Sequence, residues 1–580
     1  MPSLSALLTE QNHVPTILIA ATIITLFVYT LYSKLLPKPI PGIPFDKNAT
    51  KTILGDVLTL QDDPDGLALW CGKHLDRLGT PLCQVFMGPL AKPMVLVADI
   101  GDARDIVFGT SAFDRSDYIV DRFPLFRGFH FRMKTGDDWR LSRGWMKDLM
   151  TAQFLNSVGV SSVYDSVKKL VNLWELENRV ADGRPFSMVA DLRSLALDVI
   201  SAFYLGGDFQ DSTLGRQIDF VGKLSSDKLV VGTHNEVTFP RAPVHEFTQG
   251  MIVVGDRLAA IYDAVNTKLP PGLVSRWFRY IAPSFGKFFA AKDTFIGERL
   301  NRAFARSRRG EAARSGIDHM VFREEKAAAK ADRMPLLGNL KQVMTDEVYG
   351  NLIAGQHTTS AALVWILKFV SEHPAVQPKL HEELQTVLAA AAHDNRFPTG
   401  AELAAAKLPY LEAVIEETMR LRASFLMPRD AVRDTDLMGY RIPKGTIVVL
   451  VSQGHHFDLS SSNSSNTKKR RQYPGAANAS KDLDEFDPER WLARNDATGE
   501  VVFDGSSYPQ MAFGVGLRAC WGRKLAQMEM KMMLAMVAWK FELLPMMDAD
   551  LASHEATYDI SYRAKKGFLR LRSRGQFSAA

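Results

Sequence analysis

The most informative segment of this sequence is Phe513-Gly514-Val515-Gly516-Leu517-Arg518-Ala519-Cys520-Trp521-Gly522. Its glycines before the cysteine allow a tight backbone path, and a helical run from Lys524 to Trp539 follows. A thiolate at a helix N-terminus is stabilised by the helix dipole and by backbone N–H groups, and Arg518 adds a fixed positive charge. Because a soft thiolate is a suitable iron ligand, the segment predicts that Cys520 binds a metal. The alternative is a buried structural cysteine.

The composition argues against several classes of protein. The chain has 580 residues, of which 46% are hydrophobic, enough for a large buried core. Its formal net charge of +5 gives no sign of nucleic-acid binding. The three cysteines, Cys71, Cys83 and Cys520, cannot form a disulfide framework and lack the spacing of a zinc site. This cysteine usage favours a reducing compartment.

The N-terminal segment predicts a membrane anchor. Val14 to Tyr32 contains no charged residue and is just long enough to cross a bilayer. Glu10 precedes this segment, and Lys34, Lys38, Lys47 and Lys51 follow it. The positive-inside rule therefore places the short N-terminus across the membrane and the body of the chain in the cytosol. Residues 1–36 are expected to form a lumenal tip and one transmembrane helix. The alternative is a cleaved signal peptide, which normally has a basic residue before a shorter apolar core.

Three further regions are expected after the anchor. Residues 37–44 alternate proline with other residues, and because proline fixes φ and resists helix, they predict a stiff hinge. Residues 45–580 are expected to form one large domain. Within it, residues 460–480 are rich in Ser and Asn and contain Lys468-Lys469-Arg470-Arg471. Such a composition cannot bury a core, so it predicts a disordered surface insert. A solvated charge run is the preferred interpretation of its basic tetrad, ahead of a nuclear signal or a membrane contact.

Periodicity predicts a mainly helical domain with a small β-rich part. Helical spacing dominates from about Gly136, with the longest helix over Leu337–Glu372 and another beginning after Pro409. Strands are predicted at Pro81–Gly88, Pro93–Ala98, Tyr440–Ile442 and Thr446–Val451. The last two are joined by a turn at Pro443-Lys444-Gly445.

The segment around Cys520 resembles the haem-binding signature of the cytochrome P450 superfamily, Phe-x-x-Gly-x-Arg-x-Cys-x-Gly, without departure. The resemblance extends from the anchor to the C-terminus and is to the membrane-anchored (microsomal) type, most like the fungal secondary-metabolite monooxygenases. It implies the mainly α P450 fold with a small β-rich subdomain behind one N-terminal transmembrane helix. It also implies haem b as cofactor, residues 45–580 as the haem-thiolate catalytic domain and Cys520 as the axial ligand of the iron. Phe513, Gly514 and Arg518 are then cofactor-binding residues.

A second landmark is Glu417-Thr418-Met419-Arg420, which resembles the family's Glu-x-x-Arg helix. Alone, such a pair is usually a surface ion pair worth a few tenths of a kcal/mol. Arg490 lies in Phe486-Asp487-Pro488-Glu489-Arg490-Trp491, which matches the element that supplies the third partner. The resemblance assigns Glu417, Arg420 and Arg490 to holding the cysteine loop in place rather than to chemistry.

Ala354-Gly355-Gln356-His357-Thr358-Thr359, within the long predicted helix, resembles the family's oxygen-binding stretch. The resemblance implies that Ala354 and Gly355 leave room for dioxygen and that Thr358 manages proton delivery. Close helix packing is the alternative explanation for the glycine and the threonine. His357 stands where the family has an acid. A histidine can titrate near neutral pH, so His357 is expected to relay protons in its place or to point away and be inert.

Haem propionates need cationic partners. Trp139-Arg140-Leu141-Ser142-Arg143 resembles the family's Trp-x-x-x-Arg helix, and Arg429 matches another propionate position. The implied contacts are Trp139, Arg143, Arg429 and Arg518. Arginine suits such sites because its planar fork binds a carboxylate at two points.

The resemblance further implies external electrons. Only 60 residues follow Cys520 in this sequence, so no fused reductase is expected after it. A separate NADPH-cytochrome P450 reductase on the endoplasmic reticulum membrane is expected instead, with cytochrome b5 as an additional candidate donor. Basic residues on or after the cysteine loop predict a docking face for an acidic partner, namely Arg518, Arg523, Lys524 and Lys531.

The substrate is expected to be lipophilic. By family position, the cavity lining is expected from Phe113–Phe131, Phe203–Phe239, Leu352–Thr359, Ala423–Met427 and Asp559–Ala564. Phe123, Leu125, Phe126, Phe129 and Phe131 are apolar, as are Phe425, Leu426 and Met427. Two rival functions remain open at this level: a P450-type isomerase or dehydratase that acts without external electrons, and a non-enzymatic haem-containing ligand binder in the membrane. Substrate, regiochemistry and oligomeric state do not follow from the sequence.

Overall fold

The computed structural model describes residues 13–63, 66–89, 91–98, 112–122, 126–225, 229–263, 283–335, 339–422, 426–451, 484–508, 510–558 and 561–575. Residues 1–12 of the predicted lumenal tip and anchor (1–36) and the predicted insert (460–480) lie outside the described residues. So do Phe123, Leu125 and Phe425 of the predicted cavity wall.

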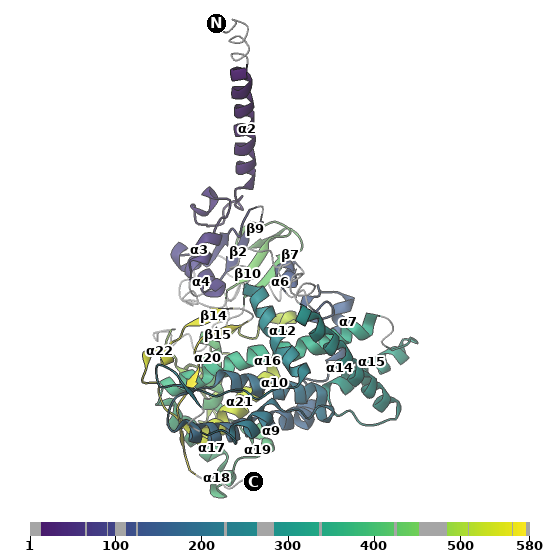
Figure 1. Ribbon diagram of the computed structural model, residues 1–580, viewed down its shortest axis with the longest axis vertical. Helices are drawn as coiled ribbons and strands as arrows, with labels where there is room; N and C mark the ends of the chain where they lie inside the picture. Colours follow the sequence, from purple (N-terminus) through teal and green to yellow (C-terminus); the bar gives the residue numbers. More distant parts are fainter. Residues whose placement is uncertain are drawn as a thin grey trace, which may run out of the picture.

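A long central helix, α16 (Asn339–Glu372), runs through the domain and organises it (Figure 1). Its 34 residues extend for about 51 Å at the α-helical rise. Most of its C-terminal two thirds is buried on every side, as expected for a helix that forms the core rather than its edge. It packs against α10 (Val189–Leu205), α12 (Glu246–Asp263), α14 (Pro283–Arg308), α20 (Pro409–Arg422) and α21 (Arg523–Lys540). The predicted helices over Leu337–Glu372, after Pro409 and over Lys524–Trp539 are confirmed as α16, α20 and α21.

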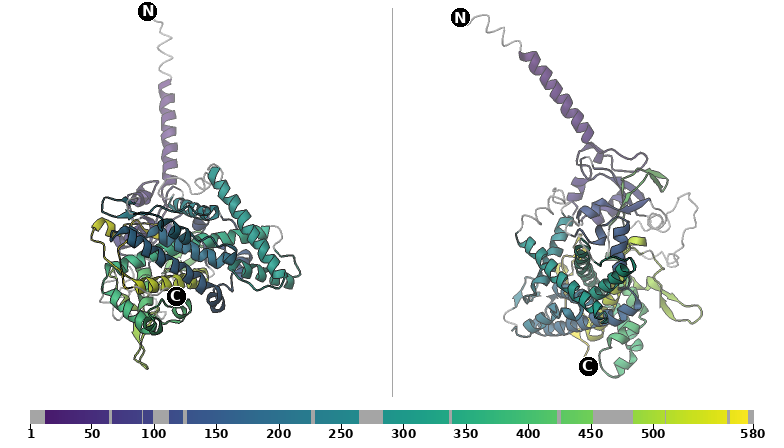
Figure 2. Two further views of the ribbon diagram at one scale, coloured as in Figure 1. Left: turned by 60° about the horizontal axis from the view of Figure 1, so that its bottom comes forward. Right: turned by 90° about the vertical axis from the view of Figure 1, so that its right-hand side faces the viewer.

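The other helices lie around this core and beside the β-rich part of the domain (Figures 1 and 2). They are α3 (Val57–Gln61), α4 (Gly66–Leu78), α6 (Asp117–Arg122), α7 (Asp137–Trp145), α8 (Ala152–Phe154), α9 (Val160–Ala181), α11 (Thr213–Val221), α15 (Gly316–Lys330), α17 (Val376–Val387), α18 (Ala389–His393), α19 (Gly400–Ala405) and α22 (Ala549–Ala552).

The β-rich part contains a five-stranded sheet in the order β1-β2-β10-β7-β3. Its strands are β1 (Leu82–Val85), β2 (Met94–Val97), β3 (Phe113–Arg115), β7 (Met427–Ala431) and β10 (Ile447–Leu450). The pair β2–β10 is parallel and the others are antiparallel. The antiparallel register of β3 and β7 places Arg115 directly opposite Arg429, so the sheet brings together two cations that are far apart in the sequence.

A smaller four-stranded sheet and several strand pairs complete the β structure. They are β4 (Phe186–Ser187) with β5 (Val230–Val231), β6 (Val237–Thr238) and β16 (Phe568–Leu569), and the pairs β8 (Thr435–Leu437) with β9 (Tyr440–Ile442), β11 (Leu492–Arg494) with β12 (Val501–Phe503), β13 (Phe541–Leu543) with β17 (Leu571–Ser573), and β14 (Ala556–Tyr558) with β15 (Tyr562–Ala564). The strands predicted from the sequence are confirmed at β1, β2, β9 and β10.

The N-terminal helix α2 (His13–Leu35) projects from the domain beyond α3 and the five-stranded sheet (Figures 1 and 2). It is long and apolar enough to cross a membrane, and its side chains from Ile17 to Leu31 are exposed in the protein alone.

The proline-rich segment 37–44 packs against the five-stranded sheet and is hydrogen-bonded to it. Ile40 and Ile43 are buried. The Gln84 side chain on β1 accepts a hydrogen bond from the N–H of Ile40 and donates to the carbonyls of Ile40 and Ile43 (2.8–2.9 Å). Because the buried Gln84 amide makes all three hydrogen bonds, it holds residues 40–43 against the sheet. This constrains the direction in which α2 leaves the domain.

Candidate active site

The cysteine loop has the tight backbone path that its glycines suggest. Gly514 and Gly516 both take positive φ values, 66° and 70°, which glycine adopts without strain. The N–H of Cys520 donates to the carbonyl of Phe513 (2.7 Å), which closes the loop, and α21 begins at Arg523. The Cys520 side chain therefore opens into an internal cavity instead of packing in the core.

The surroundings of the Cys520 thiol act on its pKa in opposite directions. Burial raises its pKa, whereas the backbone N–H groups of Gly522 and Arg523 and the charges of Arg143 and Arg523 lower it. A cation bound at the sulfur would remove the burial penalty because it stabilises the thiolate directly.

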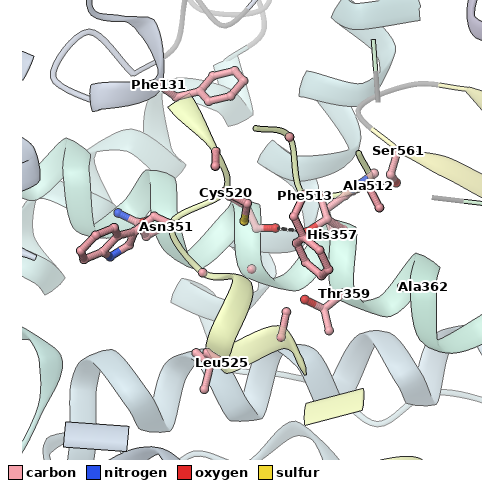
Figure 3. A pocket seen from close by; sticks show the side chains of 18 of the residues that line it. Phe131, Asn351, His357, Thr359, Ala362, Ala512, Phe513, Cys520, Leu525 and Ser561 are labelled. Atoms are coloured by element: carbon pink, nitrogen blue, oxygen red, sulfur yellow. Dashed lines mark hydrogen bonds between the residues drawn. The ribbon is translucent and has the colours of Figure 1, made fainter. Parts of the chain in front are cut away.

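Helix α16 forms the wall of the cavity opposite the loop. Ala354 and Thr358, one turn apart, both expose their side chains to the cavity, and the Thr358 hydroxyl donates to the carbonyl of Ala354 (2.8 Å). In Figure 3, Cys520 and Phe513 lie on one side of this pocket, and His357, Thr359 and Ala362 mark the course of α16 past it. A Cβ at Gly355 would lie 2.8 Å from Ile200, so this glycine allows α10 to approach α16 closely. Helix packing thus explains Gly355, while Ala354 and Thr358 face the cavity.

His357 is deeply buried, and its Nδ1 lies 3.5 Å from the Ser561 hydroxyl. Burial, followed by the charges of Arg563 and Arg193, lowers the pKa of His357 to about 3, against a smaller opposing effect of Asp256. Because burial disfavours the charged form, the His357 imidazole is held neutral at neutral pH, so any relay through it would involve the neutral ring.

A group of arginines and a tryptophan gathers at the edge of the same cavity. Arg429, Arg518, Trp139 and Arg143 are the four residues that the sequence had suggested, and all line it. Arg518 lies 4.4 Å above the Trp139 ring, and Arg143 lies 4.2 Å above the Trp521 ring. The structure therefore brings this set together at one place.

Arg115 on β3 is a further member of this group that the sequence reasoning missed. It is 4% exposed and faces Arg429 across the β3–β7 pair. Burial and the charges of Arg429 and Arg518 hold its pKa well below the ordinary range, and burial lowers the pKa of Arg429 to about 10. Only a weak signal in the sequence pointed to Arg115 as a cofactor-binding residue. It stands in a short Phe-Asp-Arg strand, and no motif around it marks it.

This cationic group fits an anionic ligand. Within the described part of the chain, Trp139 Nε1, Arg115 Nε, and Arg518 Nε and Nη1 are buried without a hydrogen-bond partner. Asp114 is the carboxylate nearby, 3.4 Å from Arg518. Burying several donors without acceptors is costly, so a group with two carboxylates, placed between the thiol and these donors, would satisfy them. The cavity residues thus fit a haem, with its propionates at the arginines and its iron at Cys520.

Behind the loop, the Glu417 carboxylate is fully buried and collects donors from two elements. It accepts from Arg420 (2.8 Å to each oxygen), from Arg490 Nε (3.0 Å) and from Trp491 Nε1 (2.9 Å). The backbone N–H of Asp487 donates to it as well (3.1 Å). The predicted grouping of Glu417, Arg420 and Arg490 is present, and Trp491 is an additional partner that the sequence reasoning had not named.

The rest of the cavity is mostly apolar, but its lining differs from the expectation in one region. Phe126, Phe129 and Phe131 contribute, as expected. Of the predicted stretch Phe203–Phe239, Tyr204 is the member that lines the cavity among the described residues, and Leu258 from α12 takes the place assigned to the others. The reason is that α12, rather than the segment before it, crosses α16 above the cavity.

Two titratable residues also differ from the expectation. Arg518 has a side chain that is 6% exposed, so it belongs to the cavity and not to a docking surface. Glu529 on α21, unnoticed in the sequence, lines the cavity, and burial raises its pKa to about 8, so it carries a proton at neutral pH. Its signal was an acid with a methionine on each side, Met528 and Met530, in the helix after the cysteine loop.

Fold and site together define a haem-thiolate protein, and comparisons with known proteins identify its family. The family model described as Cytochrome P450 matches residues 256–460 and 481–571. "Cytochrome P450 monooxygenase xilC" of Penicillium rubens is 56% identical over 99% of both chains. "Cytochrome P450 monooxygenase TRI13" of Fusarium sporotrichioides is 30% identical over 90% of this chain and 93% of its own. This chain belongs to the cytochrome P450 family, and it is a haem-dependent monooxygenase.

A solved structure agrees on the fold. The crystal structure of the cytochrome P450DA heme domain superposes with a TM-score of 0.64 at 18% identity, covering 93% of this chain and 99% of that one. The mainly helical fold with small sheets, predicted from the sequence, is confirmed.

The buried cluster at Glu417 generates a stability prediction. Glu417→Gln removes the charge that pairs with Arg420 and Arg490 and leaves buried cations without a full partner, which costs about 3–5 kcal/mol. We expect a lower unfolding temperature and loss of haem incorporation, measured by thermal denaturation and by haem content. Glu412→Gln on the same helix, where the carboxylate is partly exposed beside Lys531, is the matched control and should stay within about 0.5 kcal/mol. Equal stability of the two variants would contradict the assignment.

The placement of Arg115 generates a second prediction. Arg115→Leu should weaken haem retention by roughly ten- to a hundredfold, the equivalent of one lost charged hydrogen bond of about 1.5–3 kcal/mol. The measurement is the rate of haem transfer to an excess of apomyoglobin. Arg140→Leu, in which an exposed arginine paired with Asp137 is lost, should leave this rate unchanged. An unchanged rate in Arg115→Leu would show that Arg115 does not bind the cofactor.

Proposed function

We propose that this monooxygenase oxidises a lipophilic small molecule, by hydroxylation or a related reaction, in fungal secondary metabolism. The observation that carries the proposal is the cavity that Cys520 and Thr358 both line, between mostly apolar walls. Such walls bind a lipophilic ligand by burying its surface. The relatives named above are fungal monooxygenases, and one further relative, from Dothistroma septosporum, is named as a "Hps1-dma1 cluster cytochrome P450 monooxygenase".

Each group of residues has one task in this proposal. The bound haem supplies the iron at which dioxygen is activated. Cys520 would hold that iron through its sulfur, and the electron density of the thiolate would favour cleavage of the O–O bond. The donors at the edge of the cavity would orient the cofactor through its carboxylates; they are Trp139, Arg115, Arg143, Arg429 and Arg518. The apolar walls exclude bulk water from the reacting centre.

Thr358 and His357 are proposed to manage protons. The Thr358 hydroxyl donates its hydrogen to the carbonyl of Ala354, so an oxygen lone pair is left to accept a hydrogen bond from a proton-carrying group in the cavity. His357 is neutral at pH 7, and a neutral imidazole has one donor and one acceptor nitrogen. It can therefore pass a proton through the ring, taking one up at one nitrogen and releasing another from the second, without carrying lasting charge.

Electrons are proposed to come from NADPH through a separate cytochrome P450 reductase, with cytochrome b5 as a second donor. Arg523 and Lys524, at the start of α21, are exposed directly beside the cysteine loop. Lys524 and Lys531 each donate to a backbone carbonyl, of Met150 (3.0 Å) and Ala406 (2.6 Å), but the Lys531 side chain is only 16% exposed. The proposed docking face therefore depends on the exposed Arg523 and Lys524, which would steer an acidic partner to the side of the domain nearest the thiolate.

The protein is proposed to be a single-pass protein of the endoplasmic reticulum membrane. Helix α2 is the proposed anchor, and residues 37–44 connect it to the catalytic domain. Because Gln84 ties this connection to the sheet, the domain would sit at a set orientation above the membrane, on the cytosolic side where the lysines after the anchor are placed by charge.

The direct test of the cofactor assignment is the carbon monoxide difference spectrum of the reduced protein. We expect a Soret band at about 450 nm in the wild type and its loss in Cys520→Ala, because thiolate ligation produces that position. Cys83→Ala, at a buried cysteine on β1, is the matched control and should keep the band. A wild-type band at about 420 nm in folded protein would mean that Cys520 is not the working ligand.

The assignment of His357 predicts a change in coupling. In His357→Phe, hydrogen peroxide should rise at the expense of product per NADPH consumed, because a proton path is interrupted. With the pKa of His357 near 3, wild-type coupling should not change between about pH 6 and pH 8 through this residue. Ser360→Ala, a buried neighbour whose hydroxyl bonds to the His357 carbonyl, should couple normally. Full product yield in His357→Phe would exclude the relay.

A further inference from the structure

The cavity wall that contains Phe129 is held by two adjacent acids of α16, Asp346 and Glu347. Asp346 is 6% exposed and Glu347 is fully buried. Neither side chain lines the cavity or faces the thiol. Consecutive residues of a helix point about 100° apart, so the two carboxylates reach different parts of their surroundings.

Both carboxylates bind the backbone of one loop. The N–H of Gly128 donates to Asp346 Oδ2 (3.0 Å), and the N–H of His130 donates to Glu347 Oε2 (2.8 Å). Glu347 Oε1 also lies 2.6 Å from His130 Nδ1 and accepts from Asn351 Nδ2 (2.8 Å). Charged acceptors make the stronger hydrogen bonds, so the segment Gly128–His130 is fixed to one turn of α16.

Two glycines allow the loop and the helix to approach closely. A Cβ at Gly128 would lie 2.6 Å from the Cα of Val343, and a Cβ at Gly350 would lie 2.6 Å from the Phe129 ring. Phe129 therefore lies flat against α16 one turn after Glu347, and Phe131 stacks beside it at 6.0 Å. The polar bonds and the glycine contacts fix the same segment independently.

The clamp also includes a third element. Lys292 on α14, 3% exposed, binds Asp346 Oδ1 at 2.5 Å. Phe126 at the start of the loop packs against Tyr349 of α16 and Phe289 of α14 (centroids 5.6 and 6.4 Å apart). The loop, α14 and α16 thus meet at one buried ion pair, outside the cavity but directly behind its aromatic wall.

We propose that Asp346 and Glu347 are positioning residues for the reaction: they hold the aromatic wall Phe126–Phe131 at a fixed distance from Thr358, which the same helix carries. Because α16 carries Thr358 and also anchors the aromatic wall, this one helix sets both the position of Thr358 and the position of the wall against which the ligand packs. The proposal rests on the substrate occupying this cavity, as proposed above.

The test uses the haem-loaded full chain and two azole probes. Imidazole reaches the haem without touching the walls, whereas 4-phenylimidazole must also fit the aromatic wall. In Glu347→Gln, Asp346→Asn and Gly128→Ala, the spectral Kd of 4-phenylimidazole should rise by about tenfold, equivalent to about 1.4 kcal/mol, while that of imidazole stays within about twofold. Amide hydrogen exchange over residues 126–133 should accelerate in the same variants.

The matched control is Asp293→Asn. It removes the partly exposed carboxylate that lies 2.9 Å from the same Lys292 but touches no loop backbone, and it should change neither readout. Where Asp346→Asn does not accumulate as folded protein, Glu347→Gln and Gly128→Ala decide the matter. An unchanged ratio of the two Kd values and unchanged exchange in these two variants would overturn the proposal. Hydrogen exchange requires no ligand, so it tests the clamp even if the wild-type carbon monoxide spectrum refutes thiolate ligation.

Discussion

The buried carboxylate of Glu417 is the interaction on which the haem side of this structure depends. It is fully buried, and its oxygens accept from Arg420 on α20, from Arg490 and Trp491 in a short turn, and from the backbone of Asp487. A lone buried carboxylate is very unfavourable, and a buried cation is as well. The two elements are therefore stable only when both are in place. The segment before the cysteine loop packs on them, since Tyr508 contacts the Trp491 ring and Gln510 donates to the carbonyl of Glu416.

At the other end of the cavity, buried positive charges outnumber the carboxylate beside them. There the protein brings Arg115, Arg429 and Arg518 together with one carboxylate, Asp114, beside them, and burial together with mutual repulsion lowers the pKa values of Arg115 and Arg429. Such an arrangement is unfavourable for the protein alone and favourable once an anion is bound. Cofactor binding and folding of this edge are thereby coupled, because the propionates supply the acceptors that the buried donors lack.

Much of the fold and of the site could be predicted from local patterns. The central helix, the helix after Pro409 and strands β1, β2, β9 and β10 follow from periodicity and turn residues, since these depend on neighbours in the chain. The cysteine loop and the residues Trp139, Arg143, Arg429 and Arg518 follow from motifs with fixed spacing. Arg115 did not, because its role arises from the register between β3 and β7, which are joined by more than 300 residues of chain. Leu258 was missed for the same reason: which helix crosses α16 is a matter of packing.

The sequence by itself determined the family, the thiolate, the cationic residues that suit the propionates and the apolar N-terminal helix, because each is written in contiguous residues whose chemistry does not depend on distant neighbours. The tertiary structure decided the charge states and the directions of side chains. Whether His357 titrates, whether Arg518 faces solvent, and what holds Phe129 in place depend on burial and on partners from α10, α12, β3 and α14. Those partners meet only when the chain folds, because desolvation and hydrogen bonding are properties of the packed interior.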